Sequence, residues 1–341
     1  MIVLYILLAV VVLLLMVMIH EFGHYTAGKM LGFKINEFSI GFGPALFSKT
    51  KKNGEKFSLR LVPLGGYCAF DGEDTESENE KSFMKQKPWK RLIVLFFGAF
   101  FNILSAVIFS FVLLVSVGYD IPQITKISEV NGVGTSQSQL LVGDIITHVD
   151  GTEISFIKDQ TFNALIAKYS AGDIVEITVI RDGVKQNINL EFFKNKDNEV
   201  KLGINMKSVP YSFGKSLALC VPFTSVLCWK ILVMFWLLIT GQVALSGLGG
   251  PITTIGTMAT LSMQGISNLL VLMPLIAANL GVFNLLPIPA LDGSKMVFTT
   301  IEWIRGKPIN PKVENTIHTV GLILMFAIVI IADLYHIIVG I

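Results

Sequence analysis

Four stretches of this 341-residue sequence are apolar over enough residues to cross a membrane, and they constrain the fold more than any other feature. They cover roughly residues 2–24, 92–118, 268–290 and 317–338, each long enough to span about 30 Å of hydrocarbon. Hydrophobic residues make up 52% of the chain and charged residues only 15%, which lies outside the range of ordinary soluble domains. The sequence therefore predicts a polytopic α-helical membrane protein.

A fifth apolar stretch, residues 216–240, is ambiguous. The loop between the first two spans is rich in Lys and Arg, which places that loop in the cytoplasm and the start of the chain outside. With four spans, Asp292 lies at the cytoplasmic end of the third span, on the same side as His20 and His24. A fifth full span would move Asp292 to the opposite side. Keeping Asp292 on the same side as the two histidines therefore favours an interfacial or re-entrant position for residues 216–240. The charge bias alone does not exclude a full span.

Charge and cysteine content exclude several other classes. The net charge of +2 is small and the basic residues cluster in loops, so we expect no nucleic-acid partner. The three cysteines, Cys68, Cys220 and Cys228, form no C-x-x-C pair, which supports neither a disulfide framework nor a thiolate metal site. No Lys or Arg precedes the first apolar stretch and no small-residue cleavage site follows it, so we expect a retained span instead of a signal peptide.

An H-E-x-x-H motif, His20-Glu21-Phe22-Gly23-His24, stands at the end of the first span. Its four-residue spacing puts both imidazoles on one helix face, where they can share a zinc ion. Glu21 then lies beside the metal without binding it, where it can take a proton from a zinc-activated water and deliver it to a leaving amine. Ionisable residues are costly inside a membrane, which favours a metal site over an interfacial polar patch.

A hydrolytic zinc site usually has three protein ligands, so a third ligand must come from elsewhere. A metzincin-type continuation is excluded, because the required Gly and His are replaced by Ala27 and Met30. Asp292 is the best candidate, since Pro287 and Pro289 interrupt the end of the third span and can turn the carboxylate into a protein-lined cavity. The alternative is a helix-terminating carboxylate without metal. The side chains that compete less well are Asp333, His336 and Glu302.

Two regions have sequence patterns typical of β-strands. Residues about 120–207 are polar with alternating stretches, which predicts a small β-rich domain. Within it, residues 140–151 resemble the signature of a PDZ domain, which binds a peptide as an extra strand; a generic strand-turn-strand unit is the alternative. In the cytoplasmic loop, residues 37–40 and 56–61 also alternate. These strands could pair with an unwound substrate peptide or form a hairpin that lies on the bilayer.

Together these motifs resemble the site-2 protease family of intramembrane zinc metalloproteases, specifically the bacterial subgroup that includes the regulator-of-sigma-E protease. The resemblance covers nearly the whole chain, and its motifs are His20 through His24, Gly41-Phe42-Gly43, residues 63–67, 89–91 and 140–151, Gly249-Gly250-Pro251, and Asn284 through Gly293. The chain departs from the family pattern at Gly98-Ala99 before Asn102, at Ser294-Lys295, and in having one PDZ-like domain where some relatives have two.

The resemblance also implies roles for individual residues. One zinc ion would be bound by the residues that match the family ligands, His20, His24 and Asp292. Glu21 would act as the general base and general acid. A membrane-re-entrant β-loop would contain Gly41, Phe42 and Gly43, and Asn284 would help to hold the substrate strand.

We therefore expect four transmembrane helices, a membrane-associated β-hairpin or re-entrant loop, and one extracytoplasmic PDZ-like domain. The expected segments are an N-terminal membrane core with the zinc motif, the PDZ-like domain, an interfacial segment and a C-terminal membrane core with the third ligand, at residues 1–118, 119–207, 208–266 and 267–341. The chain would lie in a bacterial cell membrane with its active site near the cytoplasmic side.

The expected activity is zinc-dependent peptide-bond hydrolysis within or near the transmembrane segments of single-span proteins already shortened by another protease, such as anti-sigma factors or remnant signal peptides. Membrane lipid and a peptide ligand of the PDZ-like domain are further expected partners. Two alternatives are a membrane scaffold with structural zinc, which would not need Glu21, and a zinc transporter, which would need polar ligands along several spans.

Overall fold

The computed structural model describes residues 2–73, 77–127, 140–170, 172–191, 193–194, 200–201, 204–243 and 249–339, so parts of the predicted 119–207 and 208–266 segments lie outside the described residues. The chain divides into two compact units, one made of residues 1–109 and 227–341 and the other of residues 110–226. The first unit holds most of the helices and a long β-hairpin, and the second holds a β-sheet. The finer division into four segments stays a prediction.

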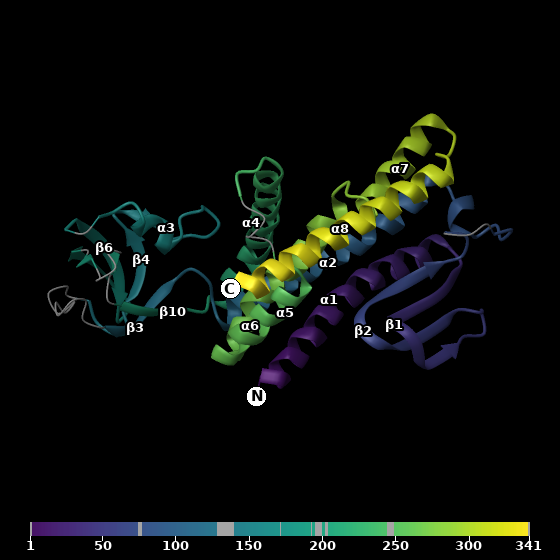
Figure 1. Cartoon of the computed structure of the whole chain (residues 1–341). Helices are drawn as coiled ribbons and strands as arrows, with labels where there is room; N and C mark the ends of the chain where they lie inside the picture. The colour runs from purple at the N-terminus through teal and green to yellow at the C-terminus, as the bar shows by residue number, and fades with distance from the viewer. Residues whose placement is uncertain are drawn as a thin grey trace. The chain divides into compact units, whose positions relative to one another are not determined.

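Helices dominate the first unit (Figure 1). Five helices of the described chain are long and apolar enough to cross a membrane: α1 (Ile2–Leu31), α2 (Pro88–Ser116), α4 (Phe213–Ile239), α6 (Ile266–Leu285) and α8 (Pro311–Val339). Four of them are the predicted spans. The fifth, α4, is the ambiguous stretch, and it forms a continuous helix. Its length and composition make α4 a candidate span as well, and the four-span arrangement stays a prediction.

The ends of these helices follow from glycine and proline. The first helix continues past residue 24 to Leu31 and stops at Gly32, whose φ of +80° is accessible to glycine at little cost. The third predicted span ends at Leu285 instead of residue 290, because Pro287 and Pro289 have no N–H to continue the helix. Two shorter helices, α5 (Pro251–Gln264) and α7 (Asp292–Arg305), complete the unit.

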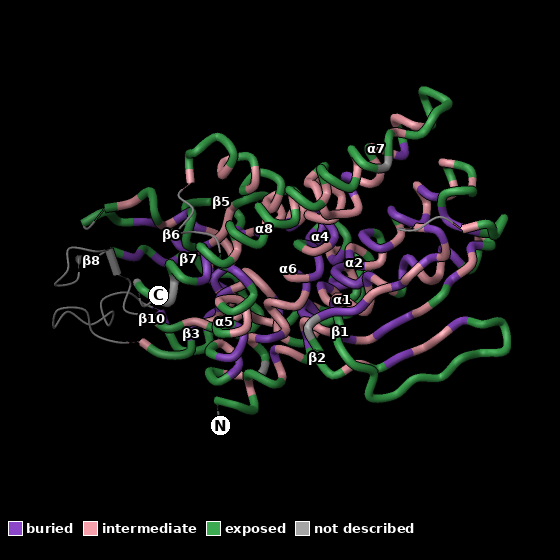
Figure 2. The backbone as a smooth tube through the Cα atoms, turned by 45° about the vertical axis from the view of Figure 1, so that its right-hand side comes forward, coloured by how far each residue is buried: buried purple, intermediate pink, exposed green. Residues whose placement is uncertain are grey.

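A twisted hairpin of β1 (Ile35–Thr50) and β2 (Lys56–Phe70) packs against α1. Residues 35–40 pair with 66–70, residues 37–40 also pair with 56–59, and residues 45–50 pair with 56–60. The predicted strands 37–40 and 56–61 are confirmed, but both are longer than the alternating pattern indicated. In β1, residues 35–41 are mostly buried or half-buried and residues 42–50 are exposed (Figure 2).

Glu55, at the turn of this hairpin, ties it to α1. Its carboxylate is buried and accepts hydrogen bonds from Tyr25 Oη at 2.9 Å, from Lys51 Nζ at 2.8 Å, and from Lys29 Nζ. Burial alone would raise the pKa of Glu55, but the hydrogen bonds from Lys29, Lys51 and Tyr25 outweigh it and lower the pKa to about 2. The hairpin is therefore held beside the helical turn that follows His24.

Close helix packing in the first unit depends on glycine. A Cβ at Gly23 of α1 would lie 2.2 Å from the Phe97 carbonyl oxygen of α2, and a Cβ at Gly281 of α6 would lie 2.7 Å from Ile103 Cγ1 of α2. Without side chains at these positions the helix backbones approach closely, as small residues permit in membrane proteins. This packing brings the H-E-x-x-H helix beside α2.

The second unit is built on an antiparallel sheet, as the alternating pattern predicted. The strands lie in the order β10 (Ile204–Ser208), β3 (Pro122–Ile127), β4 (Ile145–Val149), β6 (Ile174–Arg181) and β7 (Val184–Glu191), with β5 (Thr152–Glu153) on β4. A short helix, α3 (Phe162–Ile166), and a separate pair, β8 (Phe193–Lys194) and β9 (Val200–Lys201), complete it. The core contains Ile146, Ile177 and Val179.

Candidate metal centre

Three ligand atoms from two distant parts of the chain meet in the first unit. The His20 Nε2 and His24 Nε2 atoms lie 3.1 Å apart, and Asp292 Oδ2 lies 3.0 Å and 3.2 Å from them. The three side chains are 11%, 9% and 16% exposed. Among the described residues they form a His-His-Asp group of the kind that holds a metal ion. The predicted third ligand is therefore beside the two histidines.

The other ring nitrogen of each histidine faces α2. His24 Nδ1 lies 2.8 Å from the Val94 carbonyl oxygen, so Nδ1 carries the hydrogen and Nε2 keeps its lone pair. His20 Nδ1 lies 3.3 Å from the amide nitrogen of Asn102, whose amide oxygen is buried without a hydrogen bond. Turning this amide over would let Asn102 Oδ1 accept from His20 Nδ1–H and leave the His20 Nε2 lone pair free. Both histidines are thus oriented by α2.

Because Gly98 of α2 has no side chain, there is room for the imidazole rings of His20 and His24. A Cβ at this position would lie 2.4 Å from His24 Nε2 and 2.8 Å from His20 Cε1. Gly98 and Val94 were not recognised as parts of the site from the sequence, where Gly98 stood only as one member of a motif that departs from the family pattern. A glycine in the middle of a predicted span was the available signal, since glycine inside a helix often marks close packing.

The turn before α7 places the third ligand. Leu291 N donates to the Ile288 carbonyl oxygen at 3.1 Å across Pro289 and Ala290, and Ala290 has a φ of +75°. Proline followed by a residue with positive φ is the pattern of a type II turn, where glycine is usual at the second position. An L residue in this conformation costs about 1–2 kcal/mol. Asp292 follows directly as the first residue of α7.

Glu21 lies next to the ligands without being one of them. Its Oε2 accepts a hydrogen bond from the Cys68 backbone N–H of β2 at 3.0 Å. It also interacts electrostatically with His20, His24 and Asp292. The role of Glu21 as a general base stays a prediction, and its contact with β2 was not predicted.

The other predicted site residues lie on neighbouring elements. Asn284, near the end of α6, donates from Nδ2 to the Leu280 carbonyl oxygen of its own helix at 2.9 Å. Gly41 and Gly43 have φ of +83° and +82° in β1, and the Phe42 ring stacks on Tyr67 with centroids 6.2 Å apart. Their proposed role in substrate binding is not tested by these contacts and stays a prediction.

The competing side chains have other functions in the fold. Asp333 of α8 accepts hydrogen bonds from the backbone N–H groups of Ile252 and Thr253 at 3.2 Å and 3.0 Å, which caps the start of α5. Glu302 pairs with the buried guanidinium of Arg91. The side chain of His336 lies outside the described side chains. Neither Asp333 nor Glu302 competes with Asp292.

The His-His-Asp group fits zinc. Ligands about 2.0–2.1 Å from a tetrahedral zinc ion lie roughly 3.3 Å from one another, close to the 3.0–3.2 Å separations found here. Asp292 Oδ2 is buried and makes no hydrogen bond, which is the condition of an oxygen whose partner is a metal. Two imidazoles and one carboxylate are ordinary zinc ligands, and three ligands leave a fourth position for water.

Comparison with known proteins agrees with this site. The sequence pattern of "Peptidase family M50" matches residues 8–328. The chain is 34% identical over 327 residues to "Putative zinc metalloprotease FN1322" of Fusobacterium nucleatum, covering 94% of each chain. It is 28% identical over 347 residues to "Putative zinc metalloprotease CPE1693" of Clostridium perfringens, covering 98% of each chain.

Among solved structures, a PDZ domain of an SdrC-like protein from Listeria monocytogenes matches with 22% identity and a TM-score of 0.22, covering 27% of this chain and 93% of that chain. A score this low supports no argument, so the PDZ-like assignment stays a prediction. The M50 match and the metal site carry the identification. The chain belongs to peptidase family M50, the site-2 protease family, and is a multi-pass membrane zinc metalloprotease with a His-His-Asp metal site.

Proposed function

We propose that this zinc metalloprotease hydrolyses peptide bonds within or near the transmembrane segments of single-span proteins that another protease has already shortened. Anti-sigma factors and remnant signal peptides are the proposed substrate classes, and the bacterial regulator-of-sigma-E protease subgroup is the proposed place within the family. All the relatives reported above are bacterial, which supports a bacterial cell membrane as the location.

The observation that carries this proposal is the position of the ligands within a membrane-spanning helix. His20 and His24 belong to α1, a 30-residue helix that is apolar up to His20, and their side chains face α2 and Asp292 instead of lipid. Polar groups at this depth are retained when they serve a site inside the protein. A protease whose reactive groups lie there acts on substrates that enter the membrane.

Glu21 is the proposed general base and acid. Zinc, when bound by His20, His24 and Asp292, polarises the substrate carbonyl and makes a bound water more acidic. Glu21 takes the proton of the attacking water as its oxygen bonds to the carbonyl carbon. It then gives that proton to the leaving nitrogen as the carbon–nitrogen bond breaks, which yields a carboxylic acid and an amine.

The hairpin is the proposed guide for the substrate. A helical substrate must unwind before cleavage, because the carbonyls of an intact helix are hydrogen-bonded and shielded. The Cys68 contact brings β2 to Glu21, so an extended peptide running along this sheet would carry its carbonyls to the base. A re-entrant position of the hairpin in lipid is supported by its exposed apolar side chains, Phe42, Leu46, Phe47, Leu61 and Val62.

The proposal also covers the membrane side on which the active site lies and the partners that the chain binds. The basic loop between α1 and α2 favours an active site near the cytoplasmic face, with the residue 119–207 domain outside. A PDZ-like domain in that position would bind a peptide at a sheet edge. Asn284 would hold the substrate strand from the end of α6.

The experiment is cleavage of a tagged, pre-trimmed single-span reporter in membranes that contain wild-type protein or Glu21→Gln. We expect wild type to cut, and Glu21→Gln to keep zinc while losing at least about a hundredfold in rate, since general acid and base catalysis contributes this much. Glu80→Gln is the matched control, because Glu80 is exposed and far from α1 in sequence.

Two outcomes would contradict the proposal. Equal cleavage by wild type and Glu21→Gln would exclude Glu21 as the base. Zinc-loaded wild type that cuts none of several reporters would favour the scaffold alternative, in which the metal is structural.

A further inference from the structure

His318 of α8 contacts the turn that carries the third zinc ligand. The Ala290 backbone N–H donates to His318 Nδ1 at 3.1 Å. A backbone N–H can only donate, so Nδ1 must present a lone pair and the ring must be neutral with its hydrogen on Nε2. His318 is 28 residues away in sequence and no motif pointed to it.

The contact falls on the strained residue of the turn. Ala290 has the positive φ that glycine normally supplies at this place. Its N–H is not part of the Ile288 to Leu291 turn hydrogen bond. The bond to His318 therefore stabilises a conformation that alanine does not favour by itself, two residues before Asp292.

A second contact with α8 fixes the same turn. Gly321 lies one helical turn beyond His318, and a Cβ there would be 2.1 Å from Pro289 Cβ. Pro289 therefore rests directly on the α8 backbone. The two central residues of the turn, Ala290 and Pro289, are therefore contacted by His318 and Gly321 of the same helix, α8.

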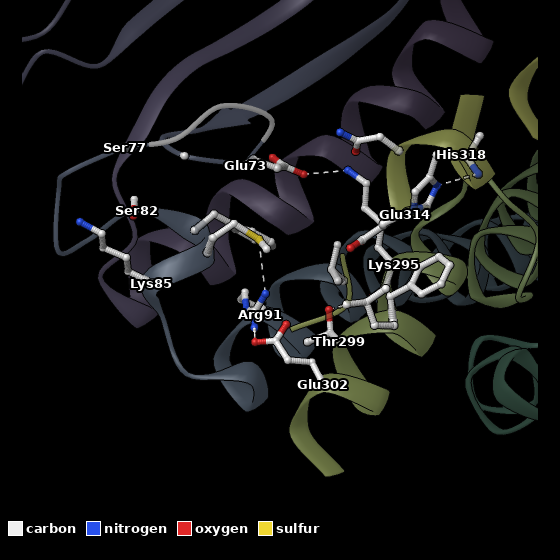
Figure 3. Close-up of a pocket in the computed structure, with 18 of the residues that line it drawn as sticks. Glu73, Ser77, Ser82, Lys85, Arg91, Lys295, Thr299, Glu302, Glu314 and His318 are labelled. Carbon is white, nitrogen blue, oxygen red and sulfur yellow. Dashed lines mark hydrogen bonds and ion pairs between the residues drawn. The ribbon is translucent and has the colours of Figure 1, made fainter. Parts of the chain in front are cut away.

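Open space adjoins the turn beside α8. A cavity of about 690 Å³ has Ala290 and His318 in its lining, together with Lys295, which pairs with Glu73 at 2.8 Å (Figure 3). Because open space adjoins the turn here, surrounding side chains do not confine it on every side. Its position then depends on specific contacts such as the one with His318.

We propose that His318 is a positioning residue for zinc: by accepting the Ala290 N–H it holds the Pro289–Ala290 turn so that the Asp292 carboxylate meets His20 and His24. His318 does not touch the metal. Its effect passes through the backbone, in the way that groups behind metal ligands tune metal affinity.

The test uses the full-length chain in detergent micelles with His318→Leu and His318→Asn. Asparagine and leucine branch at the same atom, but only asparagine offers an acceptor, its amide oxygen, near the place of Nδ1. Zinc retention is measured in chelator buffers of graded free zinc. We expect His318→Leu to bind zinc at least about tenfold more weakly, as loss of a supporting contact typically does, and His318→Asn to stay close to wild type.

A cobalt-substituted sample gives a second readout. The visible absorption of Co²⁺ reports ligand geometry, so the His318→Leu spectrum should differ from wild type while the His318→Asn spectrum matches it. Adding Ala290→Gly to His318→Leu should restore zinc retention, because glycine adopts the positive φ without help. This rescue distinguishes a positioning effect from a general loss of folding.

The proposal is overturned if the leucine and asparagine variants retain zinc equally well, or lose it equally. It is also overturned if Ala290→Gly fails to restore zinc in a His318→Leu protein that remains monodisperse and helical.

Discussion

At the scale of single residues, the metal centre depends on groups that hold the ligand rings. Val94 and Asn102 of α2 face the Nδ1 atoms of His24 and His20. Such partners fix which ring nitrogen keeps its lone pair for the metal, and losing one typically weakens metal binding. The backbone carbonyl of Val94 cannot be removed by substitution, but the Asn102 side chain can.

We predict that Asn102→Leu weakens zinc binding by about 10- to 100-fold, because no acceptor remains for His20 Nδ1–H. Asn102→Asp should keep zinc, since a carboxylate accepts from the same hydrogen. Both are compared with wild type by zinc retention in graded chelator. Equal zinc binding by the leucine and aspartate variants would show that Asn102 only fills space.

At the scale of elements, the hairpin is anchored to α1 by the ionised carboxylate of Glu55. Its pKa of about 2 lies below its ordinary value of 4.5, so the carboxylate contributes stability above pH 4.5 and loses it as the pH falls through about 2. We predict that Glu55→Gln destabilises the protein by about 1–2 kcal/mol near neutral pH, after allowing for the solvent exposure of the Lys29 and Lys51 side chains.

Thermal unfolding in detergent micelles across this pH range checks the prediction. The difference between wild type and Glu55→Gln should shrink steadily below pH 4.5, and Glu80→Gln should behave like wild type throughout. A difference that does not change with pH would mean that the ionised carboxylate is not the anchor.

Individual elements also show what sequence could and could not predict. The pairing of His20 with His24 could be predicted from their four-residue spacing in a helix. Asp292 could be predicted as the third ligand because two prolines interrupt the span before it. The contacts of His20 with Asn102 and of Ala290 with His318 could not be predicted, because they join positions 82 and 28 residues apart and depend on which helices pack together. The amphipathic α7 has no apolar run and was missed for that reason.

At the scale of the whole molecule, the metal centre restricts the topology. Because His20, His24 and Asp292 meet in one group, we expect α1 and α6 to end on the same side of the membrane. The segment between α2 and α6 must then cross the membrane an even number of times. A single crossing by α4 is incompatible with this unless the chain returns before α6.

We predict that Gln242, just beyond α4, lies on the same side as Ser170 and on the opposite side from Glu78. Single cysteines at these three positions, in a chain without Cys68, Cys220 and Cys228, are labelled with a membrane-impermeant reagent in sealed vesicles. Labelling of Gln242→Cys together with Glu78→Cys would instead show that α4 crosses and that the chain returns through the segment before α6.

His20, His24 and Asp292 together are expected to hold one zinc ion. The most direct measurement is the zinc content of purified full-length wild type and Asp292→Ala, with Asp333→Ala as the control for removing a buried carboxylate. We predict one zinc per chain in wild type and Asp333→Ala, and loss of zinc in Asp292→Ala. Full zinc content in Asp292→Ala would mean that Asp292 is not a zinc ligand.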